Sequence, residues 1–276
     1  MTRRRSFLGD ALRLMVAGVF LVPLLLAFIS AFRPDQEMFR YSARLSIYTF
    51  FPYEPTLDNI QEMLVRPYFM QQLVNTLFVG VVQSTLTVLV AAIAAFPLAR
   101  MHFRSREIIF FAILATMFVP FEALVVPLFL INKSMRMLNN FWGLMLPWIA
   151  SPVAIFLLRQ AMQEIPQELD EAAIMDGARV WHLFYNVVVP NIKPAMVTVW
   201  IVTFMYVWDS FLWPLVIMTE PSRQMVQIGI ASLFNPERIR FGNVFAGSVI
   251  AVGPVLVLFI LLQRYYQRGI ALTGMK

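Results

Sequence analysis

Two carboxylates of this chain lie in segments that are otherwise apolar. Glu122 stands within FVPFEALVVP, and Asp209 stands within VWDSFLWPL directly after Trp208. Ionisable groups inside a membrane are costly and usually mark a function. A carboxylate beside an indole could hold a sugar, because the acid accepts hydrogen bonds from hydroxyl groups while the ring stacks on the apolar sugar face. We therefore predict that Glu122, Asp209 and Trp208 line a path for a polar solute. The alternative is local pairing at an interface or among lipid headgroups.

The composition argues against several other kinds of chemistry. The 276 residues include no cysteine and 2 histidines, so we predict no thiolate catalysis, no disulfide, no metal site and no cofactor in this chain. Hydrophobic residues make up 59% and charged residues 14%, whereas soluble domains carry about 25% charged residues. The net charge of +6 is typical of basic loops at an anionic membrane surface, and we predict no nucleic-acid partner.

The elements that must position the two carboxylates are six apolar runs, each near the roughly 20 residues that a membrane-spanning helix needs. They cover residues 15–32, 73–98, 108–131, 141–158, 195–218 and 244–262. The first run is longer than the apolar part of a signal peptide and no A-x-A site follows it, which favours a retained span over a cleaved signal. In the second run Ala91, Ala95 and Ala99 recur every four residues and indicate close helix packing. We predict an all-α, multi-pass membrane protein with six transmembrane helices in a single domain, 1–276.

Basic residues predict the orientation of these spans. With six spans, one side of the membrane receives the N-terminal arginines, the loop after the second run and the C-terminal end. These residues are Arg3, Arg4, Arg5, Arg100, Arg104, Arg106, Arg264, Arg268 and Lys276. Cytoplasmic loops are enriched in Lys and Arg, so we predict that both termini are cytoplasmic. The polar stretch 164–192, between the fourth and fifth runs, then faces the cytoplasm as well.

This polar stretch, which contains EAAIMDGARVWHLFYNVVVP, begins with a predicted short helix. Pro166 suits a first helical turn, and acidic residues follow where the helix dipole favours them. Gly177 readily takes the left-handed conformation that ends a helix. We therefore expect a helix over 166–176, with the small side chains of Ala172 and Ala173 allowing a partner to approach closely.

A second, amphipathic helix is predicted to follow. Four apolar residues recur at i, i+3, i+4 and i+7, as on one face of a helix; they are Trp181, Phe184, Tyr185 and Val188. Pro190 and Pro194 are expected to end this helix before the fifth span. Helix mechanics alone favours a loop helix that lies on the bilayer surface, and the alternative is a docking helix for a soluble cytoplasmic protein.

The spacing in this stretch resembles a signature of the permease subunits of bacterial ABC importers: E-A-A, three residues, G, nine residues, then I-x-L-P. The matching positions are Glu171, Ala172, Ala173, Gly177 and Pro190, with Val187 and Val189 for Ile and Leu, and Asp176 and Ala178 completing an extended form EAAxxDGA. FLLRQAMQEIPQELDEAA, VWDSFLWPL and the ending YYQRGIALTGMK also resemble this family, and most closely the smaller second permease of maltose-type and glycerol-phosphate-type systems. This chain departs from that group at Asp209, where the group usually has Asn.

The resemblance implies a type I ABC importer permease fold and a place in the bacterial cytoplasmic (inner) membrane. The chain would be a membrane-spanning subunit of an ATP-driven importer for a sugar or related polyol and would form half of the translocation pathway. It would catalyse nothing itself, and the sequence has no GxxxxGK[ST] phosphate loop. ATP and Mg would be bound by a partner ATPase.

The resemblance also implies the partners. The segment from Glu171 to Pro190 would be a coupling helix that seats in a cytoplasmic ATPase subunit, present in two copies, and residues 272–276 would add contacts to it. A second, different permease would complete the pathway. An external solute-binding protein, periplasmic or lipid-anchored, would deliver the solute.

Two other classes of function remain open from the residues alone. An ion-gradient-driven secondary transporter could use Glu122 and Asp209 as ion sites, and such proteins often contain broken helices. It would give no reason for the spacing between Glu171 and Pro190. An integral-membrane enzyme is disfavoured by the lack of a histidine or cysteine cluster in the sequence.

Overall fold

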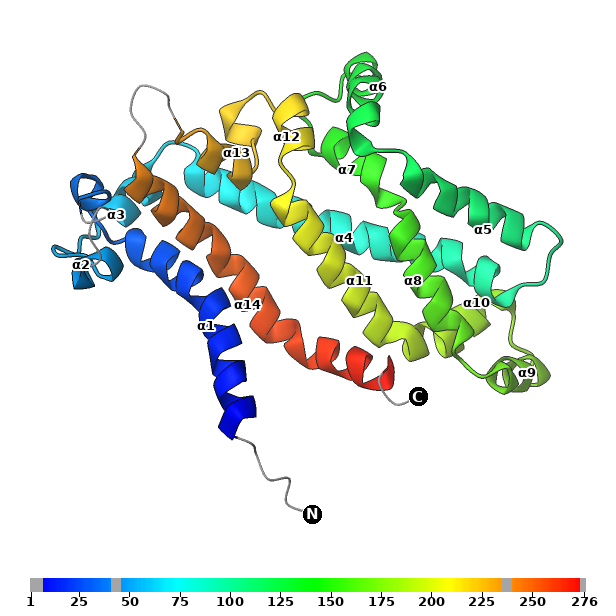
Figure 1. Ribbon diagram of the computed structural model, residues 1–276. Coiled ribbons are helices and arrows are strands. Elements are labelled where there is room, and N and C mark those ends of the chain that lie inside the picture. Colours follow the sequence, from blue (N-terminus) through cyan, green and yellow to red (C-terminus); the bar gives the residue numbers. More distant parts are fainter. Residues whose placement is uncertain (1–6, 41–45, 235–239, 274–276) are drawn as a thin grey trace. The chain divides into compact units, whose positions relative to one another are not determined.

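The computed structural model describes residues 7–40, 46–234 and 240–273, and these residues form helices and connecting loops without a β-strand (Figure 1). The chain divides into two compact units. One unit comprises Met1–Met70 and Gly229–Gly253, and the other comprises Gln71–Ile228 and Pro254–Lys276.

The helices have the following bounds. The first unit contains α1 (Phe7–Ser30), α2 (Ile47–Phe50) and α3 (Asp58–Val65). The second contains most of α4 (Phe69–Arg100) and then α5 (Arg106–Ala115), α6 (Phe121–Ser134), α7 (Phe141–Ile149), α8 (Pro152–Gln163), α9 (Gln167–Met175), α10 (Val180–His182), α11 (Val189–Asp209) and α12 (Leu212–Ile217). Both units contribute to α13 (Val226–Ala231) and α14 (Phe241–Thr273).

Three helical segments of the described residues are long and apolar enough to cross a membrane: Phe69–Arg100, Val180–Asp209 and Phe241–Leu261. Two bent helix pairs raise this number to 5 if each pair is one span. In α1 the apolar part, Met15–Ser30, is shorter. Three of the predicted apolar runs thus overlap with long helices, and the count of six spans stays a prediction.

The two bent pairs lie in the third and fourth predicted runs. Arg106–Phe118 and Phe121–Ser134 meet at 97°, and Phe141–Ile149 and Pro152–Gln163 meet at 46°. A proline stands at each bend. Pro120 is the N-cap of α6 and has an extended backbone conformation. Pro152 is the first residue of α8, and the hydroxyl group of the N-cap Ser151 accepts a hydrogen bond from the Ala154 N–H at 3.3 Å. Proline lacks the N–H that would continue a helical ladder, which explains why these runs break where they do.

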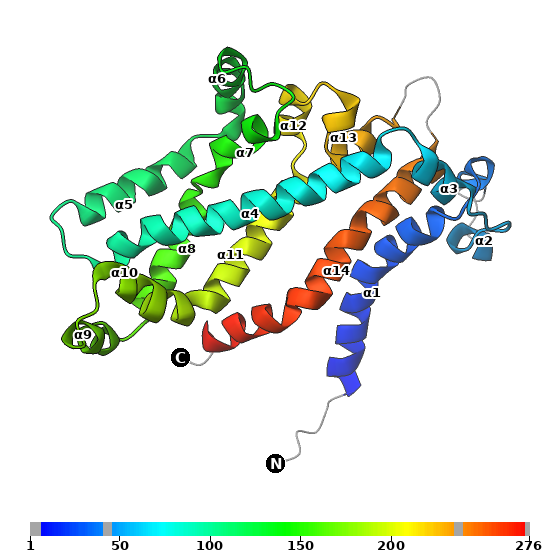
Figure 2. The same cartoon turned by 180° about the vertical axis from the view of Figure 1, so that it is seen from behind.

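One hydrophobic core of the second unit joins α4, α8 and α11, with α8 and α11 side by side (Figures 1 and 2). Ala91 and Ala95 are fully buried in it and Ala99 packs against it. Small side chains let helix backbones approach closely. The predicted packing role of this alanine stripe is confirmed.

A second core of this unit gathers around Trp213 and contains residues of α4, α7 and α12. The indole N–H of Trp213 donates a hydrogen bond to the Leu144 carbonyl at 3.1 Å. The fifth predicted run, 195–218, therefore contains two helices, because α11 ends at Asp209 and α12 begins at Leu212. The short α12 turns back against α7 instead of extending α11.

In the first unit Arg240 ties together three chain segments. Its Nε lies 3.1 Å from Asp35 Oδ2, its Nη1 donates to Glu62, and the neighbouring Gly242 N–H donates to Asp35 Oδ1 at 2.7 Å. Burial lowers the pKa of Arg240, but the hydrogen bonds and the attraction of Asp35 and Glu62 raise it more, so that its pKa lies above the usual value. The guanidinium therefore stays charged and holds the segments before α14, after α1 and in α3 together.

Candidate functional site

The short helix predicted over 166–176 is present as α9, with Pro166 and Asp176 as its caps. Pro166 thus precedes the first turn instead of standing in it. Gly177 has φ +82°, its N–H donates to the Ile174 carbonyl at 2.9 Å, and the Ala178 N–H donates to the Ala173 carbonyl at 2.9 Å. This pair of hydrogen bonds is the Schellman arrangement, in which a glycine in the left-handed region ends a helix. The spacing from Ala173 to Ala178 is therefore the spacing that this helix end requires.

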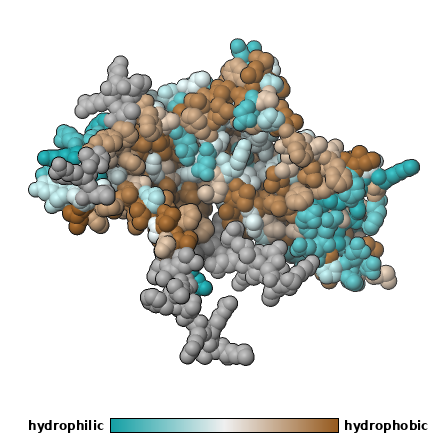
Figure 3. Space-filling view, in the orientation of Figure 1, coloured by the Kyte–Doolittle hydropathy of each residue, from teal (hydrophilic) through white to brown (hydrophobic). Residues whose placement is uncertain are grey.

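The outer surface of α9 is exposed and mixed in character. Apolar side chains stand out from the chain at Leu169, Ile174, Met175, Val180 and Trp181, with 86% of Met175 exposed. The acidic side chains Glu168, Glu171 and Asp176 are exposed beside them. Hydrophilic residues gather at this end of the second unit in the space-filling view (Figure 3). Exposed large apolar side chains are candidates for contact with a partner protein.

The inner side of α9 is fixed to α4 by Arg100. Its guanidinium Nε lies 3.3 Å from Asp170 Oδ2, and its Nη2 donates to the Ile165 carbonyl at 2.9 Å. The Arg100 and Asp170 side chains are only 4% and 15% exposed. Removing one partner of a buried ion pair is strongly destabilising because the other charge is left without compensation. The pair therefore makes α9 and the end of α4 move together.

A second arginine extends this connection to α5 and α8. Arg159 of α8 donates from Nε to the Leu98 carbonyl of α4 at 2.9 Å and from Nη2 to Glu107 of α5 at 2.6 Å. Its guanidinium carbon also lies 3.9 Å from the centre of the Phe110 ring. Three helix ends are thus joined next to the attachment point of α9.

The prediction that Pro190 and Pro194 end the second helix is wrong. The chain is helical throughout Val180–Asp209, with α10, a π-helical segment Leu183–Val188 and α11 in sequence. Pro190 stands at the start of α11, where a missing N–H is tolerated. The π-helical segment before it has i to i+5 hydrogen bonds, so the helix continues past Pro190. The Asn191 side chain also donates to the Val187 carbonyl at 2.7 Å.

The π-helical segment also divides the apolar face predicted for this helix. Phe184 and Val188 are buried in the core of α4, α8 and α11, whereas Trp181 and Tyr185 are 58% and 59% exposed. The two exposed rings stack on each other at 6.2 Å. A π-helix has more residues per turn than the 3.6 assumed in the prediction, so residues at i, i+3, i+4 and i+7 no longer share one face.

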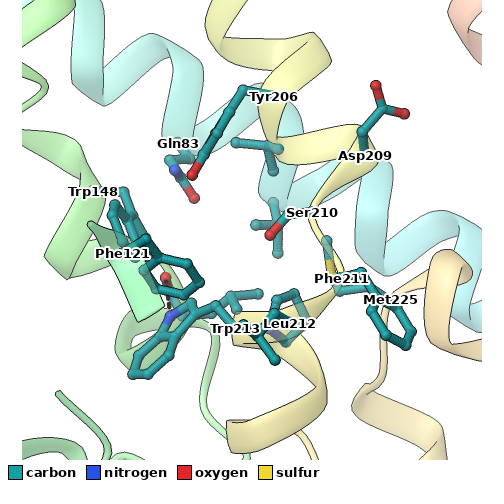
Figure 4. Close-up of a pocket in the computed structure, with 14 residues that line it drawn as sticks. Gln83, Phe121, Trp148, Tyr206, Asp209, Ser210, Phe211, Leu212, Trp213 and Met225 are labelled. Atoms are coloured by element: carbon teal, nitrogen blue, oxygen red, sulfur yellow. Dashed lines mark hydrogen bonds between the residues drawn. The ribbon is translucent and has the colours of Figure 1, made fainter. Parts of the chain in front are cut away.

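The three residues predicted to line a solute path lie in different surroundings. Asp209 is exposed at the end of α11 and lines a cavity of about 320 Å³, but its carboxylate points away from the rings of that cavity (Figure 4). Trp208 is 3% exposed, stacks on Phe204 at 5.5 Å and lines neither of the two cavities described here. Glu122 is exposed in the first turn of α6 and lines neither cavity, although Phe121 lines both. Their role on a path stays a prediction.

A larger cavity of about 480 Å³ lies further along α11 and shares four lining residues with the first: Gln83, Phe121, Trp148 and Tyr206. Both volumes fall in the range of small-molecule sites. Gln83, Trp148 and Tyr206 were not predicted to line the path, because none of them is a charged residue within an apolar segment. An uncharged amide within the apolar residues of α4 was the available signal for Gln83, since polar groups inside a membrane also need a partner.

Within the described ranges, no three histidine, aspartate or glutamate side chains lie close enough to hold a metal ion. The cavities are lined by aromatic, aliphatic and uncharged polar residues, together with Asp209. The arrangement offers hydrogen bonding and ring stacking to a solute.

Comparison with known proteins identifies the family. Residues 87–272 match the model of the binding-protein-dependent transport system inner membrane component family. The chain belongs to this family. Its members are inner-membrane components of transport systems. The several apolar helices of this transport permease agree with a multi-pass membrane protein.

Relatives of this permease match over nearly its full length. It is 29% identical over 264 residues to the arabinooligosaccharides transport system permease protein AraQ of Bacillus subtilis, covering 95% of this chain and 93% of AraQ. It is 31% identical over 262 residues to the sn-glycerol-3-phosphate transport system permease protein UgpE of Escherichia coli, covering 92% and 91%. The predicted resemblance to carbohydrate-type ABC permeases is confirmed by these relatives.

A solved structure supports the fold. The permease superposes with a TM-score of 0.79, at 20% identity, on a chain of a bacterial ABC transporter involved in the import of the acidic polysaccharide alginate. The match covers 96% of the permease and 99% of that chain. The fold is therefore the ABC importer permease fold that the sequence predicts.

Proposed function

We propose that this permease is one of two different membrane subunits of an ATP-driven importer for a sugar or related polyol. The names of its relatives support this class of solute, since they include transport permeases for arabinooligosaccharides, lactose and sn-glycerol 3-phosphate. The chain would cross the inner membrane six times with both termini in the cytoplasm, α1 and the two bent pairs supplying three of the spans.

The observation that carries the ATP-driven mechanism is the geometry of α9. A short helix with a fixed Schellman end displays an exposed apolar and acidic surface, and Arg100 holds its opposite side to α4. A surface held in this way can transmit a displacement, whereas an unattached loop would yield. We propose that α9 and the residues up to Pro190 seat in a cytoplasmic ATPase, which is present in two copies and binds the ATP and Mg.

Solute would reach the outer side from an external solute-binding protein. In support, a solved relative with a TM-score of 0.70 is an alginate ABC transporter in complex with a periplasmic protein that carries an alginate pentasaccharide. This permease would supply half of the translocation pathway and no catalytic group.

The experiment is to express the permease with its partner permease and ATPase, purify through a tag on the permease, and measure ATP-dependent uptake in proteoliposomes. We expect the ATPase to co-purify and uptake to require ATP. Glu171→Lys should abolish co-purification without loss of the permease from the membrane, because Glu171 is exposed on α9. Glu164→Lys, an exposed residue before α9, is the matched control and should leave co-purification unchanged.

Uptake that proceeds without the ATPase and follows an imposed proton or sodium gradient would instead establish the secondary-transporter alternative. In that case Glu171→Lys should have no effect on uptake.

A further inference from the structure

One face of α4 carries an unusual number of buried polar side chains. Six of them are less than 9% exposed: Gln72, Asn75, Thr76, Gln83, Ser84 and Thr87. Burying a polar group costs free energy unless a hydrogen bond compensates for it. The partners of these side chains therefore indicate what each is for.

The three residues near the start of α4 are satisfied by the chain itself. Gln72 donates to the Pro221 carbonyl at 3.1 Å, and Asn75 donates to the Ser222 carbonyl at 2.9 Å. The Thr76 hydroxyl accepts from the Val226 N–H at 2.8 Å. These side chains hold the loop between α12 and α13 and have a structural role.

The hydroxyl groups of Ser84 and Thr87 have no hydrogen-bond partner among the described residues, and these two residues line neither cavity. The amide of Gln83 also has no partner within the described part of the chain, although Gln83 is only 4% exposed. It lines both cavities, and Figure 4 shows its side chain directed into the space between Trp148 and Tyr206. A buried amide that faces a cavity offers one acceptor and two donors to a ligand.

Of the two rings near Gln83, that of Trp148 is fixed by its neighbours. Trp148 makes edge contacts with Phe121 at 5.1 Å and with Trp213 at 6.4 Å. The indole N–H of Trp213 donates a hydrogen bond to the Leu144 carbonyl. The indole N–H of Trp148 and the hydroxyl group of Tyr206 have no hydrogen-bond partner among the described residues. Trp148 is thus held in place while its polar edge stays available.

The charge of the two cavities bears on which solute they fit. Among the described residues, no lysine or arginine lines either cavity, and the one carboxylate in their linings is that of Asp209. Phosphate and carboxylate groups are bound in proteins mainly by arginine, lysine or helix N-termini. A lining of amide, indole and phenol groups instead suits hydroxyl groups and an apolar ring face.

The cavities also follow one another along α11. The α11 residues that line the first are Tyr206, Val207 and Asp209, and those that line the second are Val199, Val202, Thr203 and Tyr206. At 1.5 Å per residue, residues 199 to 209 extend over about 15 Å, or about half of the hydrocarbon core. Gln83, Trp148 and Tyr206 stand where the two cavities meet.

We propose that Gln83, Trp148 and Tyr206 form a binding subsite of this subunit for one ring of an uncharged sugar. The Gln83 amide pairs with neighbouring hydroxyl groups, the Tyr206 hydroxyl adds a further hydrogen bond, and the Trp148 indole stacks on the ring. This inference rests on the proposed function as a sugar importer. It selects, among the solutes named for the relatives, uncharged sugars over anionic ones.

The test uses the complete importer in proteoliposomes, with lactose and arabinotriose as uncharged probes and sn-glycerol 3-phosphate as the anionic probe. Gln83→Leu and Trp148→Leu should each reduce uptake of the uncharged probe by about tenfold or more, since each removes a group that contacts the sugar. Tyr206→Phe removes one hydroxyl group from an exposed residue and should give a smaller loss. ATPase co-purification should stay unchanged in all three, which separates this subsite from coupling.

Trp142→Leu is the matched control, because Trp142 also lies on α7, is 50% exposed and lines neither cavity. Uptake by this variant should equal that of the unaltered importer. ATP-driven uptake that is insensitive to Gln83→Leu, Trp148→Leu and Tyr206→Phe would overturn the subsite while leaving the importer function intact. Preferential uptake of sn-glycerol 3-phosphate would overturn the preference for uncharged sugars. Absence of ATP-driven uptake of any probe while an ion gradient drives uptake would overturn the importer function itself.

Discussion

The surface of α9 and the cavities beside α11 differ in which side chains are exposed and which are buried. Apolar side chains of α9 are exposed, its polar inner contact is buried, and a hydrogen-bonded helix end fixes its length. At the cavities the aromatic residues are packed against one another and a buried amide is left without a partner. The first arrangement suits a permanent protein partner, and the second suits a solute that must also leave.

The difference teaches where each kind of site is encoded. The α9 surface is local, since one stretch of about twenty residues supplies the helix and its ends. The cavities are assembled from α4, α7 and α11, which are far apart in the sequence. Mutations should accordingly divide into those that change coupling and those that change solute handling.

The largest expected effect is at the attachment of α9. Arg100→Leu leaves Asp170 without its buried partner and should cost about 3–5 kcal/mol of stability. Thermal unfolding of the purified complex should therefore start at a clearly lower temperature, with ATP hydrolysis no longer linked to uptake. Arg106→Leu is the control, because its pair with Glu107 is more exposed and such pairs contribute about 0–1 kcal/mol. Equal stability of the two variants would show that Arg100 does not hold α9.

The next effect is at the end of α9. Gly177→Val forces a β-branched residue into the left-handed region at φ +82°, which should cost about 1–2 kcal/mol and displace the helix end. We expect loss of ATP-driven uptake with normal insertion into the membrane. Gly18→Val is the control, since Gly18 is helical, has open space around it and has no positive φ. The prediction fails if Gly177→Val imports at the normal rate.

A smaller effect on uptake is expected from the packing behind the cavities. Trp213→Phe leaves the buried Leu144 carbonyl without its donor and should cost about 1–3 kcal/mol. Unfolding temperature and the KM for solute should both change, because Trp213 supports Trp148. The control Trp200→Phe removes an exposed hydrogen bond to Thr85 and should change neither. Equal effects of the two substitutions would mean that the Trp213 hydrogen bond is of no special importance.

The smallest effect is expected at Asp209. Its carboxylate is exposed and points away from the cavity rings (Figure 4), so Asp209→Asn should change the KM for an uncharged sugar by only about twofold, as surface substitutions usually do. Uptake kinetics in proteoliposomes measure this. A loss comparable to that of Gln83→Leu would make Asp209 a direct contact of the solute and would shift the subsite toward the end of α11.

Sequence patterns predicted the local elements well. The α9 helix and its glycine end follow from Pro166 and Gly177, since capping depends on a few adjacent residues. The packing stripe of Ala91 and Ala95 follows from helical spacing. The prediction that the helix ends at Pro190 was wrong, because a π-helical turn lets the chain continue into α11. No residue pattern in the sequence predicts this turn. The same turn exposes Trp181 and Tyr185.

The sequence by itself determined that this is an apolar helical protein with a short helix of fixed length at Gln167–Met175, because hydropathy and helix capping are properties of adjacent residues. Only the tertiary structure decided which polar groups face the two cavities. Gln83, Trp148 and Tyr206 lie on separate helices, and Trp208 differs from Trp148 only in what surrounds it. Whether a buried polar group is satisfied depends on where other segments of the chain fold against it, and no local pattern contains that information.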